Sequence, residues 1–105
     1  GEASAPVAAR VADARARQAE RFAGMGLAIR LNSQAEGEAL EDAAAMDEDA
    51  RELLGRAAER LGLSARGMSR ALRLARTLAD LEGAADVRRG HVAEAVSYRQ
   101  ARVAA

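Results

Sequence analysis

The chain has 105 residues and a mass of 11.0 kDa, which is the length of a single domain. Half of its residues are hydrophobic, but 29 of them are alanine, which leaves 23 larger apolar side chains for a core. That supply suits a small helical core and is too small for an enzyme with a deep pocket. All 16 basic residues are arginine, and there is no cysteine. The composition therefore excludes catalysis by lysine or by a thiol, and it excludes thiolate metal sites.

No part of the sequence is predicted to enter a membrane or to direct secretion. No stretch approaches the roughly 18 apolar residues that span a bilayer, and the charged, alanine-rich start lacks the apolar centre of a signal peptide. We therefore expect a cytoplasmic protein with no membrane partner. Because the sequence does not begin with methionine, we expect Gly1 to be a cloning remnant or a cut within a longer protein.

The chain is expected to begin with a disordered lead-in or cloning remnant over residues 1–6, followed by one helical domain over residues 7–105. Residues 7–23 are strong helix formers without glycine or proline. The pair Gly24 and Gly26 is expected to end this helix. One face of the helix is expected to carry Val7, Val11, Ala14, Gln18 and Phe22.

The rest of the chain predicts further helices. Residues 27–37 are irregular and contain turn residues. Four helices are expected after them, over residues 38–45, 47–62, 64–82 and 89–102. Asp47 and Ser64 are candidate N-caps, and Gly62 and Gly83 are candidate helix stops. No stretch alternates with a period of two, so we predict an all-α fold, a small bundle of four or five helices.

Charge is arranged in blocks, although the formal net charge is zero. Between residues 36 and 52 there are eight acids and one base, Arg51. Between residues 53 and 76 there are six arginines and one acid, Glu59. A zero total therefore hides an acidic middle and a basic helix, which is important for the choice of partners.

The basic helix is the most informative segment. A cap at Ser64 places Arg66 in the first turn, where the helix dipole disfavours a cation by a few tenths of a kcal/mol up to about 1 kcal/mol. An anion is favoured at the same place by free N–H groups and a guanidinium together. Arg70 and Arg73 continue the face of Arg66 at spacings of four and seven residues. The helix is thus a candidate to bind phosphate groups of a nucleotide or of a nucleic-acid backbone.

A simpler interpretation of the same residues is a solvated arginine face. In that case Asp80, four residues after Arg76, would neutralise part of the charge. The spacing alone leaves both interpretations open.

Four separated motifs stand out along the chain. They are Val11-x-x-Ala-Arg-x-x-Gln-x-x-Arg-Phe22 followed by Asn32, Leu53-Leu54, Leu63-Ser-Ala-Arg66 through Ala75-Arg-Thr-Leu-Ala-Asp-Leu81, and His91-Val-Ala-Glu-Ala-Val-x-Tyr-Arg99. In this order they resemble one family, the carboxy-terminal domain of magnesium-chelatase-related AAA+ ATPases of the ComM and YifB type. The resemblance covers roughly residues 7–100, and its one visible departure is Gly90, where a polar or acidic residue would favour the last helix.

The resemblance implies a lid, the small helical domain that closes over ATP and Mg²⁺ bound by an upstream AAA+ core. Arg66 of Ser-Ala-Arg matches the sensor-2 arginine, which contacts the terminal phosphate of the nucleotide. Arg70 and Arg73 would be supporting phosphate or intersubunit contacts. On the first helix, Arg15, Gln18 and Arg21 match family positions, and they would brace the neighbouring helix or contact the nucleotide edge or another subunit.

The resemblance also implies partners for the parent protein: the upstream core, neighbouring subunits of a hexameric ring, and DNA during branch migration in natural transformation. The chain alone is not expected to be an ATPase or to hold a cofactor, because it has no Gly-x4-Gly-Lys-[Ser/Thr] loop. With one histidine, His91, we expect no metal site and a packing or capping role for that residue.

Two other functions remain open. One is a stand-alone helical module that binds DNA or protein through the face of Arg66, Arg70 and Arg73. The other is a structural spacer that holds ring subunits together.

Overall fold

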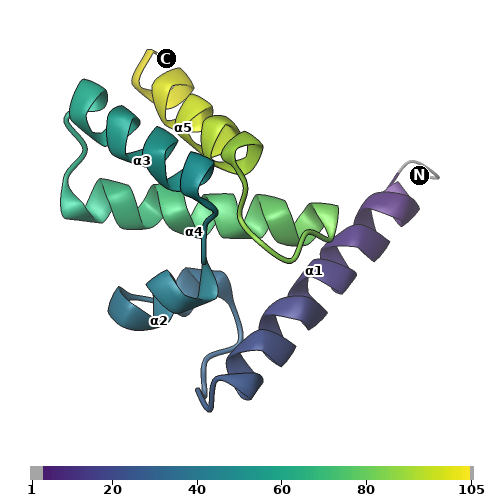
Figure 1. Ribbon diagram of the computed structural model, residues 1–105. Coiled ribbons are helices and arrows are strands. Elements are labelled where there is room, and N and C mark those ends of the chain that lie inside the picture. Colours follow the sequence, from purple (N-terminus) through teal and green to yellow (C-terminus); the bar gives the residue numbers. More distant parts are fainter. Residues whose placement is uncertain (1–3, 105) are drawn as a thin grey trace.

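The protein is all-helical, as a computed structural model of the chain shows (Figure 1). The structure describes residues 4–104, with side-chain environments for residues 4–98. The elements are α1 (Ser4–Gly24), the short 3₁₀ helix η1 (Asn32–Gln34), α2 (Gly37–Ala43), α3 (Glu48–Leu61), α4 (Ala65–Glu82) and α5 (Arg89–Ala104). Within the described residues there is no strand; Met46 and Val87 form one isolated bridge. The predicted all-α fold is confirmed.

Helix α4 is the centre of the arrangement. It contacts α1, α2, η1 and α5, and α3 packs against α5. Figure 1 shows α3 and α5 on one side of α4, with α2 on the other side and α1 crossing near the C-terminal end of α4. Ala71, Ala75 and Ala79 form the buried side of α4, and their small side chains allow the neighbouring helices to approach closely. The core is therefore built around a stripe of alanine.

The ends of α3 and α4 follow the predicted signals. The Asp47 side chain accepts a hydrogen bond from Ala50 N at 2.8 Å, and Ser64 Oγ accepts one from Gly67 N at 3.1 Å. These bonds satisfy N–H groups that have no partner within the helix. Gly62 and Gly83, which end the two helices, have φ angles of 61° and 81°, a conformation that glycine adopts without a steric penalty. Both caps and both stops are confirmed.

Helix α1 differs from its prediction at its beginning. It starts at Ser4, inside the lead-in expected over residues 1–6; residues 1–3 lie outside the described residues. Pro6 is accommodated because it is the third residue of the helix, where a backbone N–H would have no partner within the helix.

The predicted buried face of α1 forms only in its second half. Ala14, Gln18 and Phe22 are buried, but Val7 and Val11 are 49% and 36% exposed. All residues from 4 to 13 are exposed, because this half of α1 extends away from the other helices (Figure 1).

None of the described helices combines the length and the apolar character that a membrane-spanning helix needs.

Candidate functional site

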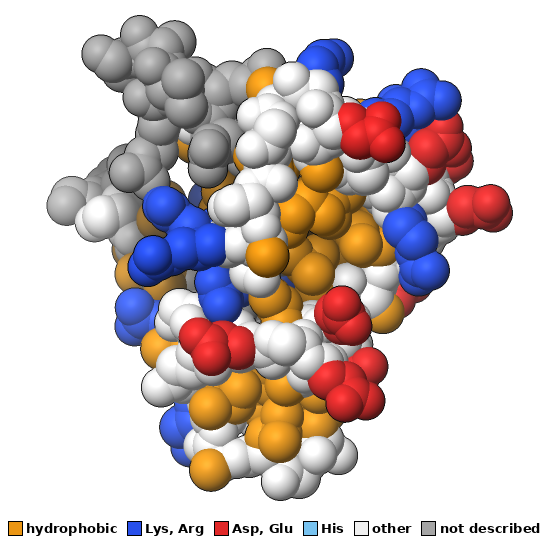
Figure 2. Space-filling view, turned by 90° about the vertical axis from the view of Figure 1, so that its left-hand side faces the viewer, with side chains coloured by type: hydrophobic (Ala, Val, Ile, Leu, Met, Phe, Trp, Pro, Cys, Tyr) orange, Lys and Arg blue, Asp and Glu red, His pale blue; other side chains and the backbone are white. Residues whose placement is uncertain are grey.

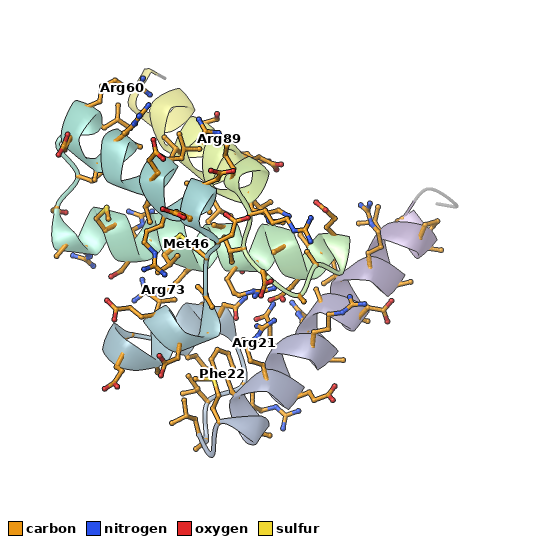
Figure 3. All side chains as sticks on the ribbon, viewed as in Figure 1. Arg21, Phe22, Met46, Arg60, Arg73 and Arg89 are labelled. Atoms are coloured by element: carbon orange, nitrogen blue, oxygen red, sulfur yellow. The ribbon has the colours of Figure 1, made fainter. Side chains whose placement is uncertain are left out.

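A buried polar cluster joins α1, η1 and α4. Its centre is the carboxylate of Asp80, which is 0% exposed. Arg21 of α1 forms an ion pair with Asp80 Oδ1, and its Nη1 donates to Asp80 Oδ2 at 3.2 Å. Arg17, one turn earlier, donates to the backbone carbonyl of Asp80 at 3.3 Å. Figure 3 shows Arg21 extending from α1 toward α4. These contacts attach the second half of α1 to the C-terminal half of α4.

Asn32 brings the segment before α2 into the same cluster. Its side chain is 1% exposed, and its Nδ2 donates to Asp80 Oδ2 at 2.9 Å and to Thr77 Oγ1 at 3.1 Å. Its Oδ1 accepts from Arg21 Nη1 at 3.2 Å, and its backbone N–H donates to Gln18 Oε1 at 2.8 Å. One buried residue of η1 thus bonds to side chains on two helices, α1 and α4, which determines where η1 sits on α4.

Arg76 is the second base of the cluster, and it is 2% exposed. Its Nη2 lies 3.0 Å from Asp80 Oδ1, and its guanidinium donates to the carbonyl oxygens of Ala84 and Ala85 at 2.8 Å and 3.0 Å. A longer bond of 3.4 Å reaches the carbonyl of Ala43. Burial lowers the pKa of Arg76, while the negative charge of Asp80 opposes this shift.

The position of the Arg76–Asp80 pair contradicts part of one interpretation of the basic helix, in which Asp80 neutralises a solvated arginine face. The pair forms, but it is in the core and does not neutralise a solvated face. Arg76 and Asp80 lie next to the buried Ala75 and Ala79, on the inner side of α4. The spacing of charged residues alone does not reveal this burial.

Arg66 lies where its prediction placed it, in the first turn of α4 and exposed to solvent. It borders a shallow hollow between α4 and the segment that joins η1 to α2. The hollow is lined by Ser33, Glu36, Ala65, Arg66, Ser69 and Arg73. The hollow thus brings the Arg66 guanidinium together with the Ser33 and Ser69 hydroxyl groups, a combination that suits an oxyanion, with the Glu36 carboxylate at its edge.

Arg70 and Arg73 differ in their environments. Arg73 is half-buried between α4 and α2 (Figure 3), where its Nε donates to the carbonyl of Ala35 at 2.8 Å. Its Nη2 is 3.9 Å from Glu36 Oε1. Arg70 is exposed and borders a second hollow with Ser33, Arg73 and Thr77. The two hollows share Ser33 and Arg73, so the three predicted arginines lie along one side of α4.

The predicted residues of the first helix have separate environments. Gln18 and Arg21 are in the polar cluster and brace η1 and α4. Arg15 is exposed and borders a hollow of α1 and the following loop, beside Arg30 and Gln34. The structure therefore does not bring Arg15 together with Arg66.

His91 makes the capping contact that was expected of it. It is 6% exposed, and its Nδ1 accepts from Arg88 N at 2.9 Å, at the start of α5. Its Nε2 lies 3.0 Å from Glu82 Oε2. In a neutral ring, Nε2 therefore carries the proton and donates to Glu82. Within the described residues, no group of three or more acidic or histidine side chains could hold a metal ion.

Sequence reasoning missed the roles of Asn32, Arg76 and Asp80. All three occur in motifs that resemble the family, so a signal was present. However, charged residues on a helix are usually exposed to solvent, and only the packed structure shows that these side chains are buried. Ser33 was missed because an isolated serine in an irregular segment carries no specific signal.

Comparison with known proteins gives consistent findings. The chain matches the family described as magnesium chelatase, subunit ChlI C-terminal, over residues 1–99. It is 39% identical over 99 residues to "Uncharacterized protein YifB" of Salmonella typhimurium, and 38% identical over 100 residues to "Competence protein ComM" of Haemophilus influenzae. Each alignment covers 94% of this chain and 18% of the relative, so the chain spans under a fifth of their length. No solved structure matches it.

Proposed function

Because the chain belongs to the magnesium chelatase subunit ChlI C-terminal family, we propose that it is the helical lid of an AAA+ ATPase and that Arg66 is its sensor-2 arginine. In this proposal an upstream core of the parent protein binds ATP and Mg²⁺, and the lid closes over the nucleotide. We also propose that the parent protein is a cytoplasmic ring motor that acts on DNA; one of the relatives is named a competence protein.

The position of Arg66 is the observation that carries the proposal. A cation in the first turn of a helix is placed against the helix dipole, so the fold itself gains nothing from it. Arg66 is nevertheless exposed there, beside Ser69 and the half-buried Arg73. A phosphate oxygen at this place would receive N–H groups of the helix start and a guanidinium at once.

The chemistry follows from this placement. During phosphoryl transfer, negative charge is spread over the oxygens of the transferring group, and a fixed guanidinium stabilises that charge. Arg73 is already oriented by the Ala35 carbonyl, so it would support the site at no further ordering cost. Because α4 is tied to α1 and η1 through Asp80, loss of the phosphate would be transmitted to the whole lid.

The test is ATP turnover of the full-length protein that carries Arg66→Ala. We expect kcat to fall by about 10²-fold or more, the effect of removing one preorganised charge donor. Arg66→Lys should not restore turnover, because an ammonium cannot replace the planar guanidinium fork. Arg60→Ala, an exposed arginine of α3 outside the hollow, is the matched control and should retain turnover. Unchanged kcat in Arg66→Ala would favour a structural spacer.

The stand-alone binding module makes a different prediction. It requires the isolated chain to bind short duplex DNA, with affinity that falls steeply with salt and weakens in Arg70→Ala. We expect little binding, because Glu36 lies 3.9 Å from Arg73 and the acidic residues of α2 border the same face. Tight, salt-dependent binding would replace the lid proposal with the binding module.

A further inference from the structure

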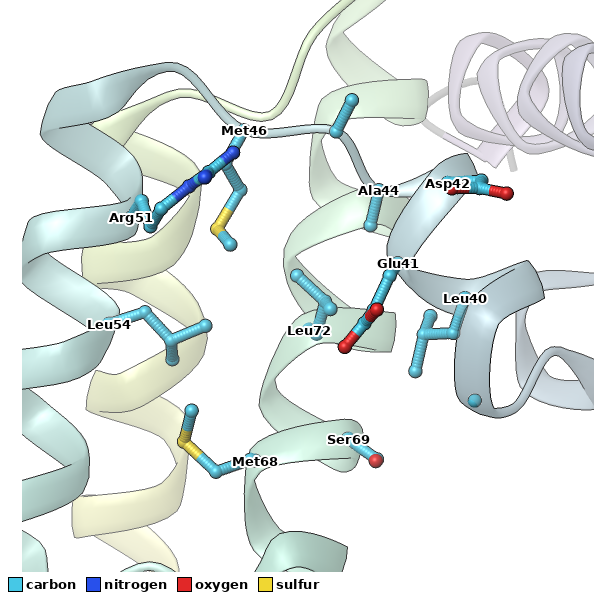
Figure 4. A pocket seen from close by; sticks show the side chains of 12 residues that line it. Leu40, Glu41, Asp42, Ala44, Met46, Arg51, Leu54, Met68, Ser69 and Leu72 are labelled. Carbon is cyan, nitrogen blue, oxygen red and sulfur yellow. The ribbon is translucent and has the colours of Figure 1, made fainter.

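An apolar groove lies beside the Arg66 hollow. Helices α2 and α3 form its walls and α4 forms its floor, with a volume of about 670 Å³. Figure 4 shows the apolar side chains that line it, which are Leu40, Met46, Leu54, Met68 and Leu72. Two of these are methionines at half-buried positions, and methionine adapts its shape readily to an apolar partner.

The α2 side of the groove is acidic. Glu41 and Asp42 line it, and both are exposed. Arg51 lines the groove at the opposite wall, next to Met46 in Figure 4. On the face drawn in Figure 2, hydrophobic side chains gather in the middle, with both acidic and basic side chains around them. A partner that carries an apolar ridge flanked by positive charge would complement this groove.

The first half of α1 has that chemistry. Val7 and Val11 are one turn apart on the same side of the helix and are 49% and 36% exposed. Arg10 follows Val7 by three residues and Arg15 follows Val11 by four, so these arginines flank the valine ridge. The ridge extends the stripe that is buried further along α1, at Ala14, Gln18 and Phe22.

A chain cannot fill its own groove in this way. The groove lies at the first half of α4, around Met68 and Leu72. The first half of α1 points away from the body beyond the opposite end of α4 (Figure 1). The ridge and the groove can therefore meet only between two copies.

We propose that residues 4–15 of one copy bind in the groove of a second copy. Val7 and Val11 contact the side chains of Met46 and Met68, and whichever of the two flanking arginines lies on the α2 side, Arg10 or Arg15, faces Glu41 and Asp42 of the other copy. Each contact pairs the ridge of one copy with the groove of another, and in a head-to-tail arrangement it can repeat from copy to copy. The inference rests on the assembly of neighbouring subunits in the proposed function, but not on the role of Arg66.

Sedimentation velocity of the isolated chain over a range of concentrations tests the contact. We expect concentration-dependent association that weakens by about tenfold or more in Val7→Gln/Val11→Gln and in Glu41→Arg/Asp42→Arg. All four positions are exposed, so the helical circular dichroism should persist. Ala5→Gln/Ala9→Gln, on the opposite side of the same half-helix and also exposed, is the control and should associate like the original chain.

Mixing the two variants tests the polarity. The valine variant keeps an intact groove, and the acid variant keeps an intact ridge. A head-to-tail contact therefore predicts that neither variant assembles alone and that the mixture forms a 1:1 dimer that does not grow further. A mixture that remains monomeric would overturn the proposal.

The absence of cysteine permits a direct test of proximity. A mixture of Val11→Cys and Glu41→Cys chains should form a heterodimer with a short thiol crosslinker, whereas Ala9→Cys, on the opposite face of the helix, should not do so with Glu41→Cys. An original chain that stays monomeric at millimolar concentration, or equal crosslinking from position 9, would exclude a second copy as the occupant. Neither result would alter the expected loss of ATP turnover in Arg66→Ala, so the two proposals fail separately.

Discussion

Arg76 and Asp80 form an ion pair one turn apart on α4, with Nη2 3.0 Å from Oδ1 and side chains only 2% and 0% exposed. Arg21 of α1 contacts the same carboxylate, so two guanidinium groups share one buried acid. Backbone carbonyl oxygens accept the remaining hydrogen bonds of Arg76, except at its Nε, which has no partner in the described structure. One buried carboxylate therefore holds two guanidinium groups, from α1 and α4, in place.

Asp80→Asn is expected to destabilise the isolated chain by about 3–5 kcal/mol, because it leaves buried guanidinium charge without its counter-charge. Urea unfolding followed by circular dichroism measures the change. The matched control is Glu52→Gln, since Glu52 pairs with Arg56 at 2.7 Å where both side chains are more than half exposed. That pair should contribute at most about 0.5 kcal/mol. Similar losses in the two variants would show that Asp80 does not hold the cluster together.

Asn32→Ala is expected to cost about 2 kcal/mol, because it removes a buried amide that bonds to Arg21, Thr77 and Asp80. The loss of stability should be larger around η1 than in the rest of the domain. Amide hydrogen exchange is therefore expected to accelerate more in the segment around η1 than in α4. Ser33→Ala, the exposed neighbour, should change the unfolding free energy by less than about 0.5 kcal/mol. Unchanged exchange around η1 would contradict the anchoring role.

Substitutions in the first turn of α4 should affect the stability of the domain and the ATP turnover of the full-length protein differently. Ser64→Ala removes the cap of Gly67 N and should cost about 1 kcal/mol. Arg66→Glu replaces a cation with an anion at the positive end of the helix, so it should raise stability by a few tenths up to about 1 kcal/mol. The same substitution should abolish the turnover of the full-length protein. Thermal unfolding of the isolated variants checks the first two values; a destabilised Arg66→Glu would mean that Arg66 has a structural role.

His91 should exist as the tautomer that carries its proton on Nε2. Nitrogen-15 NMR of the imidazole ring distinguishes the two tautomers directly. His91→Ala is expected to cost about 1–2 kcal/mol through the lost cap at Arg88. His91→Asn should recover part of that loss, since its oxygen can accept the same N–H bond. A proton found on Nδ1 would contradict the assigned hydrogen bonds.

The helices could be predicted from the sequence because their end signals are local. The caps at Asp47 and Ser64 and the stops at Gly62 and Gly83 act within one turn, so short-range patterns suffice. The exposure of Val7 and Val11 could not be predicted in this way. Their spacing continues a true buried stripe, and only the crossing of α1 over α4 determines where burial ends.

The site was predictable to a similar extent. The exposed first-turn position of Arg66 follows from the cap at Ser64, which is again a local effect. The contact of Arg73 with the Ala35 carbonyl joins residues 38 positions apart, and the Asp80 cluster joins residues up to 63 apart. No periodicity encodes such pairings. The arginines of α4 therefore looked alike in the sequence, although Arg66 is exposed, Arg73 is braced and Arg76 is buried.

The exposed half of α1 acts mechanically as a lever arm. Ten helical residues, from 4 to 13, reach about 15 Å beyond the packed body, at 1.5 Å a residue. The base of this arm is fixed, because Arg17 and Arg21 attach the next turns to Asp80. A bound domain that moves the tip of this arm therefore turns the packed helices together. Arg66 then moves along an arc around the point where α1 crosses α4.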